Sequence, residues 1–275
     1  MIKFLPYYSF NECFAYIWQY ILMKVNWKNE YKKFDIQNHI IAKLQSKFTL
    51  KSSILSNEIK IEDLNLAFRK NSSDAEVIHQ IWVQEEYKKP LEIIKQNIEL
   101  ANKPIIFDIG ANIGMASLYF KHKLPLASIY CFEPFKVNRV RIPNQFNVSP
   151  KALWKKDTKL EASLNFRDGK EWSVVVMETP EGNIQGAQLS TLMNDFKINS
   201  IDILKVDVEG SEYPAFLEDK SIEETLAHVK SIVIEIHDDA GNRNDLYTKL
   251  KECHFINYPL GELDVFINSK LSFVK

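Results

Sequence analysis

Four ionisable side chains stand in two pairs, and each pair ends a short apolar stretch of the chain. Asp207 and Glu209 close the segment SIDILKVDVEG, while Glu235 and His237 close HVKSIVIEIH. Residues two apart in a β-strand point to the same face, so each pair presents its side chains together. A neutral histidine is a suitable base near physiological pH, and carboxylates also accept protons from reacting groups. We therefore take Asp207, Glu209 and His237 as the candidate catalytic residues.

Structural roles are the alternative for each of these residues. Glu209 and Glu212 could cap the helix that follows them, Asp207 could hold Lys205 or a backbone amide, and a lone histidine is more often structural than catalytic. The cluster could also hold a divalent cation through hard oxygen ligands. No spacing here requires a metal, so the sequence by itself predicts none.

A second group of residues occupies the segment FDIGANIG, where an apolar strand runs into a turn. Glycine permits a sharp turn, a close approach of a ligand to the backbone, and tight packing of the next helix. Free amides at the start of that helix would hold a carboxylate or a phosphate. Ligands of parallel sheets bind beyond the carboxyl ends of the strands. The candidate ligand-binding residues in this turn are Asp108, Gly110, Ala111, Asn112 and Gly114.

The glycine spacing narrows the class of ligand. A dinucleotide fingerprint needs three glycines, and Asn112 and Met115 occupy two of those places when the pattern is aligned on Gly110. A P-loop is also excluded, because no Gly-Lys-Ser/Thr follows. The pattern D-x-G-x-x-x-G is instead the turn of class I methyltransferases. Their cofactor, S-adenosylmethionine, has an ammonium group that suits a carboxylate such as Asp108.

An acidic residue also ends the second predicted strand. In ASIYCFEP, Glu133 and Pro134 stand about 20 residues beyond the glycine turn, where a carboxylate can accept hydrogen bonds from ribose hydroxyls. Nicotinamide enzymes and methyltransferases both use this arrangement, so Glu133 supports nucleoside binding without choosing between them. Glu133, Pro134 and Asp207 complete the candidate cofactor-binding set.

A sheet must bring these residues together, and the chain from residue 104 predicts one. Strand-like segments alternate with helix-like segments through PIIFDIG, ASIYCFEP, NVSPKALW, SIDILKVDVEG and HVKSIVIEIH. Strands separated by helices indicate a parallel sheet with right-handed crossovers. The end of the chain, FINYPLGELDVFIN, predicts two strands joined at Gly261, an antiparallel pair that closes the sheet.

The first part of the chain has a different pattern. Residues 1–60 predict a helical preface, and residues 58–69 alternate in polarity as half-buried strands or a hairpin would. The apolar run at residues 13–25 is shorter than the roughly 20 residues that cross a bilayer. We interpret it as a buried or interfacial amphipathic helix, which also allows peripheral contact with a membrane or a partner.

Composition limits the class of protein. The 275 residues carry a formal net charge of −1, so we expect no nucleic-acid partner. Three cysteines far apart in the chain indicate a reducing compartment and no zinc site, and we expect a cytoplasmic protein. The length fits one α/β domain, residues 61–275, preceded by the helical preface of residues 1–60.

Six segments occur in the order SSDAEVIHQIWVQEEY, FDIGANIG, FEP, KALW, QLSTLMNDF and IDILKVDVEGSEYPAFL. Through them the chain resembles the FkbM-like methyltransferases, from about Phe68 to Asn268. The resemblance implies a class I, Rossmann-like α/β fold with a mostly parallel seven-stranded sheet and a C-terminal antiparallel strand. It also implies S-adenosylmethionine as the cofactor. The family's helix-plus-strand segment after the second strand is reduced here to residues 135–150.

The resemblance favours an O-methyltransferase that acts on a hydroxyl of a sugar, a glycan or a small metabolite. Two alternatives stay open, a nicotinamide-dependent oxidoreductase and a non-catalytic nucleoside-binding module. The missing glycines argue against the first of them. The combination of Asp108, Glu133 and Asp207 argues against the second.

Overall fold

The computed structural model describes residues 40, 44, 48–52, 56–61, 64–69, 72–163 and 175–272. The chain divides into two compact units between Gln84 and Glu85. Each unit is described by itself.

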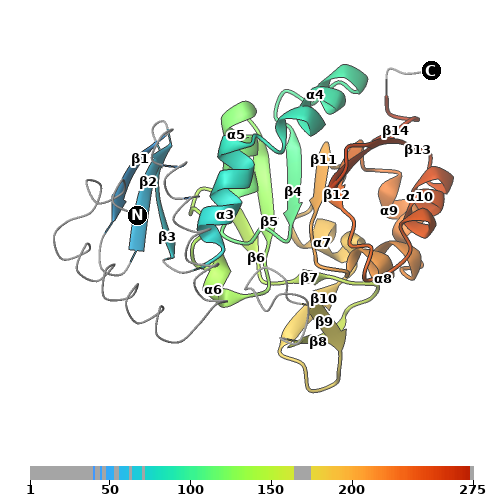
Figure 1. Ribbon diagram of the computed structural model, residues 1–275. Helices are drawn as coiled ribbons and strands as arrows, with labels where there is room; N and C mark the ends of the chain where they lie inside the picture. Colours follow the sequence, from blue (N-terminus) through green and yellow to red (C-terminus); the bar gives the residue numbers. More distant parts are fainter. Residues whose placement is uncertain are drawn as a thin grey trace. The chain divides into compact units, whose positions relative to one another are not determined.

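The N-terminal unit contains a three-stranded antiparallel sheet in the order β1-β2-β3 (Figure 1). Its strands are β1 (Thr49–Ser52), β2 (Ser56–Ile61) and β3 (Leu64–Arg69). Ile59 and Ile61, two residues apart, are both buried, as the polarity alternation requires. The pairing of β2 with β3 confirms the hairpin predicted for residues 58–69.

The predicted helical preface is wrong for its last residues. Ile40 and Leu44 are helical, but β1 and most of β2 lie within residues 1–60. The alternating segment NEIKI suits a strand with one buried face, and this period of two outweighs the helical spacing that precedes it. The apolar run at residues 13–25 lies outside the described residues.

A short helix follows the hairpin. It comprises α3 (Asp74–Ile78) and continues as the π-helix η2 (His79–Val83). Asp74 is buried, accepts the backbone amide of Arg69 at 2.8 Å and forms an ion pair with the Arg69 guanidinium. This charge-assisted pair ties α3 to the end of β3.

The C-terminal unit is built on a seven-stranded sheet in the order β13-β14-β12-β11-β4-β5-β6 (Figure 1). Neighbouring strands are parallel, except that β14 runs antiparallel to β12 and β13. The strands are β4 (Ile105–Ile109), β5 (Ser128–Phe132), β6 (Asn147–Ser149), β11 (Ile203–Val206), β12 (Ser231–Glu235), β13 (Phe255–Pro259) and β14 (Leu263–Asn268). This is the predicted class I methyltransferase fold, a Rossmann-like α/β arrangement.

Helices cover both faces of this sheet. Figure 1 shows α4 (Lys88–Asn97) and α5 (Met115–Lys123) on one side and α8 (Glu212–Leu217), α9 (Ile222–Leu226) and α10 (Arg243–Glu252) on the other. Two further short helices are α6 (Lys136–Arg139) and α7 (Leu189–Asp195). Because both faces are covered, the central strand β11 is buried along its whole length. No helix among the described residues is long and apolar enough to span a membrane.

A second sheet of four short strands has the order β7-β10-β8-β9. The strands are β7 (Ala152–Leu153), β8 (Thr158–Ser163), β9 (Val175–Glu178) and β10 (Ile184–Ala187). The single strand predicted over NVSPKALW is wrong, because β6 joins the large sheet and β7 joins the second one. Pro150 stands between them, and a proline has no amide hydrogen to continue a ladder.

Candidate active site

The turn between β4 and α5 requires glycine because another strand end lies against it. Gly110 has a φ of +76°, and a Cβ atom there would lie 1.7 Å from the carbonyl oxygen of Asp207. No other residue fits so close an approach. Asn112 also has a positive φ, of 50°, and Gly114, the residue before α5, has a φ of 83°. The turn therefore brings the end of β4 directly against the end of β11.

The amides of this turn are bonded within the chain. Gly110 and Ala111 both donate to the carbonyl oxygen of Phe132, at 3.0 and 3.1 Å, and Asn112 donates to the carboxylate of Glu133 at 2.9 Å. The predicted free amides belong to the start of α5 instead, and anion binding there stays a prediction. The turn shapes the site through its backbone path and its attachment to β5.

Asp108 lies beneath the turn. Its carboxylate is fully buried, accepts a hydrogen bond from Ser117 at 2.6 Å and lies 3.1 Å from Nζ of Lys205. Lys205 also donates to the carbonyl oxygen of Gly110 at 2.8 Å. Burial disfavours the Lys205 ammonium, but the charges of Asp108 and Asp207 outweigh it and raise its pKa. The contact of Asp108 with a cofactor ammonium stays a prediction, and the observed contacts give Asp108 a positioning role.

Glu133 lies at the end of β5 and faces the pocket. One carboxylate oxygen accepts the amide of Asn112 and the other accepts the amide of Phe135, each at 2.9 Å. Burial raises the pKa of this carboxyl to about 7, although the two backbone hydrogen bonds act in the opposite direction. The predicted position of Glu133, at the end of the second strand of the sheet, is the observed one, and its contact with a ribose stays a prediction.

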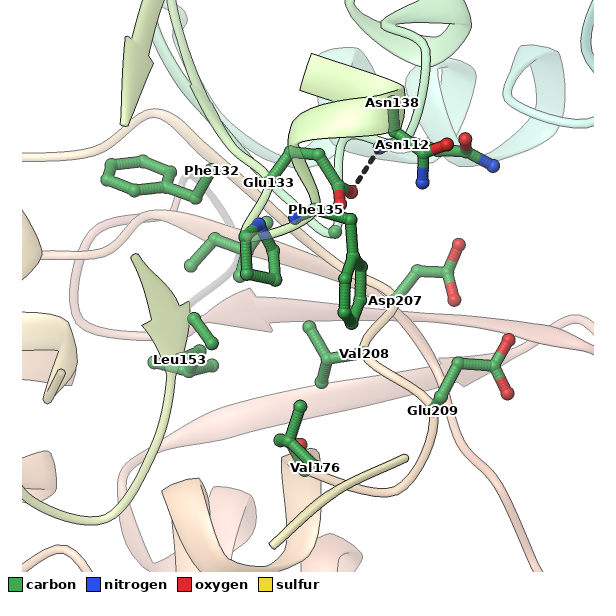
Figure 2. Close-up of a pocket in the computed structure, with 15 residues that line it drawn as sticks. Asn112, Phe132, Glu133, Phe135, Asn138, Leu153, Val176, Asp207, Val208 and Glu209 are labelled. Atoms are coloured by element: carbon green, nitrogen blue, oxygen red, sulfur yellow. Dashed lines mark hydrogen bonds between the residues drawn. The ribbon is translucent and has the colours of Figure 1, made fainter. Parts of the chain in front are cut away.

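A pocket opens at the carboxyl ends of β4, β5 and β11 (Figure 2). It encloses about 640 Å³ of space, part of it open to solvent. Figure 2 shows the carboxylates of Asp207 and Glu209 at one end, while Phe132 and Leu153 lie at the other. The pocket therefore has a polar end and an apolar end.

The apolar wall comes from a part of the chain that the sequence did not assign to the site. Leu153 of β7 and Val176 of β9 line the pocket together with Phe135. The second sheet thus supplies two apolar residues of this wall. Sequence reasoning missed this wall, because the pairing β7-β10-β8-β9 joins distant segments of the chain.

The two predicted pairs of ionisable side chains meet at the polar end. One ligand-type atom from each of Asp207, Glu209 and His237 lies within 4.8 Å of the others. Nε2 of His237 is 3.5 Å from Glu209 and 3.5 Å from Glu235. Burial, and then the charge of Asp207, raise the pKa of Glu235 to about 8. The predicted convergence of these four residues is therefore observed.

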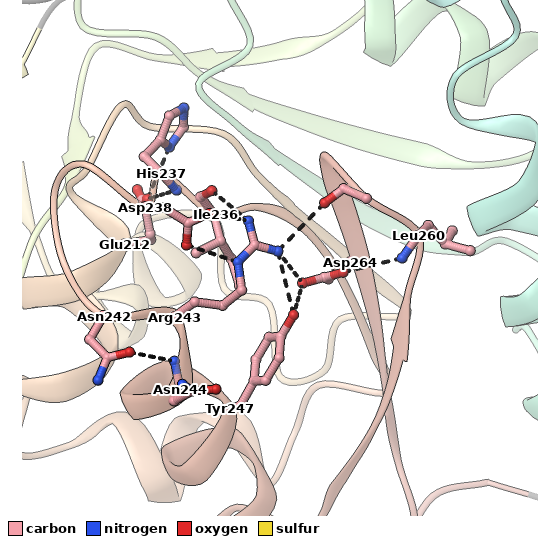
Figure 3. Close-up of polar contacts among 11 residues, drawn as sticks. Glu212, Ile236, His237, Asp238, Asn242, Arg243, Asn244, Tyr247, Leu260 and Asp264 are labelled. Carbon is pink, nitrogen blue, oxygen red and sulfur yellow. Dashed lines mark hydrogen bonds and ion pairs between the residues drawn. The ribbon is translucent and has the colours of Figure 1, made fainter.

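A buried carboxylate orients His237. Glu212 is fully buried, and its Oε1 lies 2.9 Å from both the backbone nitrogen and Nδ1 of His237 (Figure 3). Its second oxygen accepts the amide of Gly210 at 2.8 Å. Burial lowers the pKa of His237, but the hydrogen bond and charge of Glu212, with Asp207 and Glu209, outweigh it and raise the pKa to about 9. Glu212 therefore fixes the ring with Nε2 toward the acidic cluster.

The loop that carries His237 is held by Arg243. Figure 3 shows the Arg243 guanidinium between the loop and β14. It donates to the carbonyl oxygen of Ile236 at 3.1 Å, pairs with Asp238 at 2.9 Å and pairs with Asp264 at 3.1 Å. These contacts fix both residues that flank His237, through the buried Asp264 on one side and the exposed Asp238 on the other.

Several of the predicted site residues line the pocket. They are Gly110, Asn112, Glu133, Pro134, Asp207 and Glu209. Asp108 and Gly114 support the turn from behind, and the amide of Ala111 bonds to β5. His237 reaches the polar end through its contact with Glu209.

Three side chains at the site were missed, namely Lys205, Glu212 and Glu86. Glu86 precedes α4, and burial, with the charges of Asp207 and Glu262, raises its pKa to about 7. Its only sequence signal is its place in VQEEY, within the first family-like segment. The sequence offers Lys205 as a partner of Asp207 and Glu212 as a helix cap, but it does not reveal their contacts with Asp108 and His237.

Comparison with known proteins gives the family. The model of the methyltransferase FkbM domain matches residues 108–258, which is more than half of the chain. Methyltransferase sdnD of Sordaria araneosa is 28% identical over 204 residues, covering 57% of this chain and 75% of sdnD. AMB antimetabolite synthetase AmbE of Pseudomonas aeruginosa is 24% identical over 214 residues, covering 61% of this chain. The match spans only 10% of AmbE.

Solved structures are related at low identity. Methyltransferase FkbM of Methylobacillus flagellatus has 10% identity and a TM-score of 0.41, covering 62% of this chain and 44% of that one. The fibrillarin pre-rRNA processing protein of Methanococcus jannaschii has 10% identity and a TM-score of 0.37, covering 80% of this chain and 96% of that one. From the match over residues 108–258, the chain belongs to the methyltransferase FkbM domain family.

Proposed function

We propose that this protein transfers the methyl group of S-adenosylmethionine to a hydroxyl oxygen of a sugar, a glycan or a small metabolite. Family membership supports the methyltransferase activity. The observation that carries the cofactor assignment is Glu133, a buried carboxylate that faces a pocket with one apolar and one acidic end.

The pocket suits the three parts of this cofactor. The ribose hydroxyls donate to Glu133, whose oxygens keep lone pairs beyond those used by the two amides. The adenine ring packs between Phe135 and the apolar wall of Leu153 and Val176. The sulfonium end then points toward Asp207, whose negative charge stabilises the positive charge of the cofactor.

The acidic end suits a neutral acceptor with hydroxyl groups. An acceptor oxygen attacks the methyl carbon in line with the carbon–sulfur bond, that bond breaks, and S-adenosylhomocysteine leaves. Positioning supplies much of the rate, because the sulfonium is a good leaving group. The hydroxyl proton passes to the group formed by Asp207, Glu209 and His237. An anionic acceptor is disfavoured by the like charges at this end.

Calorimetry on the full chain with S-adenosylmethionine, S-adenosylhomocysteine and NAD, run side by side, tests the proposal. We expect the first two to bind and NAD not to bind, because the turn lacks two glycines of the dinucleotide fingerprint. Binding of NAD in preference to S-adenosylmethionine would favour an oxidoreductase. Binding of S-adenosylmethionine without turnover on any acceptor would favour a non-catalytic module.

The predicted cytoplasmic location is part of this proposal. It is supported by Cys131 and Cys253, which are both buried free thiols. The predicted contact of residues 13–25 with a membrane or a partner falls outside the described residues and stays an expectation.

A further inference from the structure

The acidic end of the pocket contains a histidine whose outer nitrogen lacks a hydrogen bond. The side chain of His237 is only 3% exposed, and its Nε2 is buried with no hydrogen-bond partner. The carboxylates of Glu209 and Glu235 each lie 3.5 Å from this nitrogen. A buried ring nitrogen without a partner is costly, and here it points into a group of negative oxygens.

Glu212 determines which nitrogen is left free. Oε1 of Glu212 accepts a hydrogen bond from Nδ1 of His237, 2.9 Å away, and the backbone amide of His237 donates to the same oxygen. In the neutral ring, a proton held at Nδ1 leaves the lone pair on Nε2, and a metal ion that binds there displaces any proton from Nε2. Metal-ligating histidines commonly donate their other ring nitrogen to a carboxylate in this way, which fixes the tautomer and the ring orientation.

The nearby lysine does not neutralise the cluster. Lys205 lies 3.6 Å from Asp207, but it lies closer to Asp108, at 3.1 Å, and donates to the carbonyl oxygen of Gly110. Asp207, Glu209 and Glu235 therefore hold three carboxylates around one imidazole lone pair. Such a set is stabilised by a compact positive charge placed among the oxygens.

We propose that Asp207, Glu209 and His237 bind a divalent metal ion through one carboxylate oxygen each and Nε2. These three atoms already lie within 4.8 Å of one another, and the side chains come from neighbouring strand ends. Carboxylates with one imidazole suit Mn²⁺ and similar first-row ions. Glu212 is then a positioning residue for the ligand His237.

The chemical consequence rests on the proposed function. An acceptor hydroxyl that joins the ion as a further ligand loses its proton more easily, because a bound divalent ion lowers the pKa of its oxygen ligands. Nε2 cannot bind the ion and take the proton at the same time. On this arrangement Asp207, Glu209 and His237 hold the ion in place of receiving the proton, and Glu235 receives it.

Mn²⁺ binding to the full, chelator-stripped chain tests the site. We expect one Mn²⁺ by calorimetry, and an electron-spin-echo signal from a coordinated ring nitrogen. His237→Gln should remove the nitrogen signal and weaken binding at least tenfold, and Glu212→Gln should weaken binding by about 10- to 100-fold. Glu209→Gln provides a second ligand variant if His237→Gln does not fold. Glu181→Gln, an exposed carboxylate outside the cluster, is the matched control and should bind like wild type.

Two outcomes would overturn the site. One is the absence of Mn²⁺ binding to the wild type up to about 1 mM, the weak end of protein sites for divalent ions. The other is equal binding by wild type and by folded His237→Gln and Glu209→Gln. S-adenosylmethionine binding, measured on the same metal-free protein, keeps the two proposals apart. Its failure alone would sink the proposed function and leave the metal site standing.

Discussion

Nζ of Lys205 lies 3.1 Å from Oδ1 of Asp108, and both side chains are buried beneath the glycine turn. The pair joins β4 to β11, and Ser117 of α5 completes the contacts of Asp108 at 2.6 Å. The same lysine donates to the carbonyl oxygen of Gly110. The charge of Asp108 is thus balanced by a residue of the same domain. The floor of the pocket depends on this ion pair.

Removing either partner should destabilise the fold strongly. We expect Asp108→Asn and Lys205→Met each to lower the free energy of unfolding by about 3–5 kcal/mol, because each leaves one buried charge without its partner. The double variant Asp108→Leu/Lys205→Met should lose less than the sum of the two. Urea unfolding followed by circular dichroism measures all three. If Asp108→Asn is as stable as wild type but binds S-adenosylmethionine more weakly, Asp108 contacts the cofactor directly, as the sequence predicts.

Glu133 should control cofactor affinity. Glu133→Gln loses charge-assisted hydrogen bonds worth about 1.5–3 kcal/mol, so we expect the affinity for S-adenosylmethionine to fall by roughly 10- to 150-fold. Calorimetry on the folded variant measures the change. Glu161→Gln, an exposed residue of β8, serves as the control. Unchanged affinity in Glu133→Gln would remove the ribose assignment.

The raised pKa of Glu133 also predicts a pH dependence of nucleoside binding. The ionised carboxylate accepts ribose hydroxyls better than the neutral acid, and burial raises its pKa to about 7. Adenosine carries the ribose without the ionisable amino-acid end of the cofactor, so it isolates this contact. Its affinity should rise by up to roughly tenfold per pH unit below pH 7 and level off above it. Glu133→Gln should show a flat profile, and a flat profile in the wild type would contradict the assignment.

The carboxyl group of Glu133 should also make the stability of the fold depend on pH. Between about pH 4.5 and pH 7 the folded protein holds the Glu133 proton and the unfolded chain does not. Because the native state binds more protons, the free energy of unfolding that this residue contributes falls as the pH rises through this window. Urea unfolding at pH 5 and pH 7.5 should therefore show a larger loss in wild type than in Glu133→Gln. An equal loss in both proteins would place the pKa of Glu133 near its ordinary value.

The main sheet could be predicted because its signals are local. Buried parallel strands appear as short apolar runs, and Asp207, Glu133 and Glu235 mark the carboxyl ends of three of them. Their convergence then follows from the rule that parallel strands end on one edge. The second sheet could not be predicted, because its short strands pair across long loops. β7, for example, pairs with β10 and not with the adjacent β8.

The sequence also could not predict most side-chain contacts between residues that are distant in the chain. The role of Asp108 depends on Lys205, which is distant in sequence but lies on the neighbouring strand. His237 is oriented by Glu212, which the sequence presents only as a possible helix cap. Glu212 does accept the amide of Gly210 near the start of α8, and its other oxygen holds the histidine. The sequence around Glu212 therefore indicates its contact with Gly210, whereas its contact with His237 follows only from tertiary packing.

The last prediction separates cofactor binding from methyl transfer. Glu133 lies beside Asn112 and Phe135, apart from the carboxylates of Asp207 and Glu209 at the acidic end (Figure 2). Changing His237 or Glu209 should therefore leave the affinity for S-adenosylmethionine almost unchanged. Sugar hydroxyls are weak acids and need help to lose their proton. A variant without the group that removes this proton, or assists its removal, should therefore turn over about 10²- to 10⁴-fold more slowly.

We expect His237→Ala and Glu209→Gln both to bind the cofactor and to lose turnover, and Glu181→Gln to retain both. The assay is mass spectrometry of products from a panel of nucleotide sugars, oligosaccharides, small phenols and amines. Phenols ionise more readily than sugar hydroxyls and depend less on a base, so any phenol turnover should fall less than sugar turnover in the variants. A product methylated on nitrogen or carbon would contradict O-methyl transfer. Full activity of both variants on a sugar acceptor would show that positioning alone accounts for the rate.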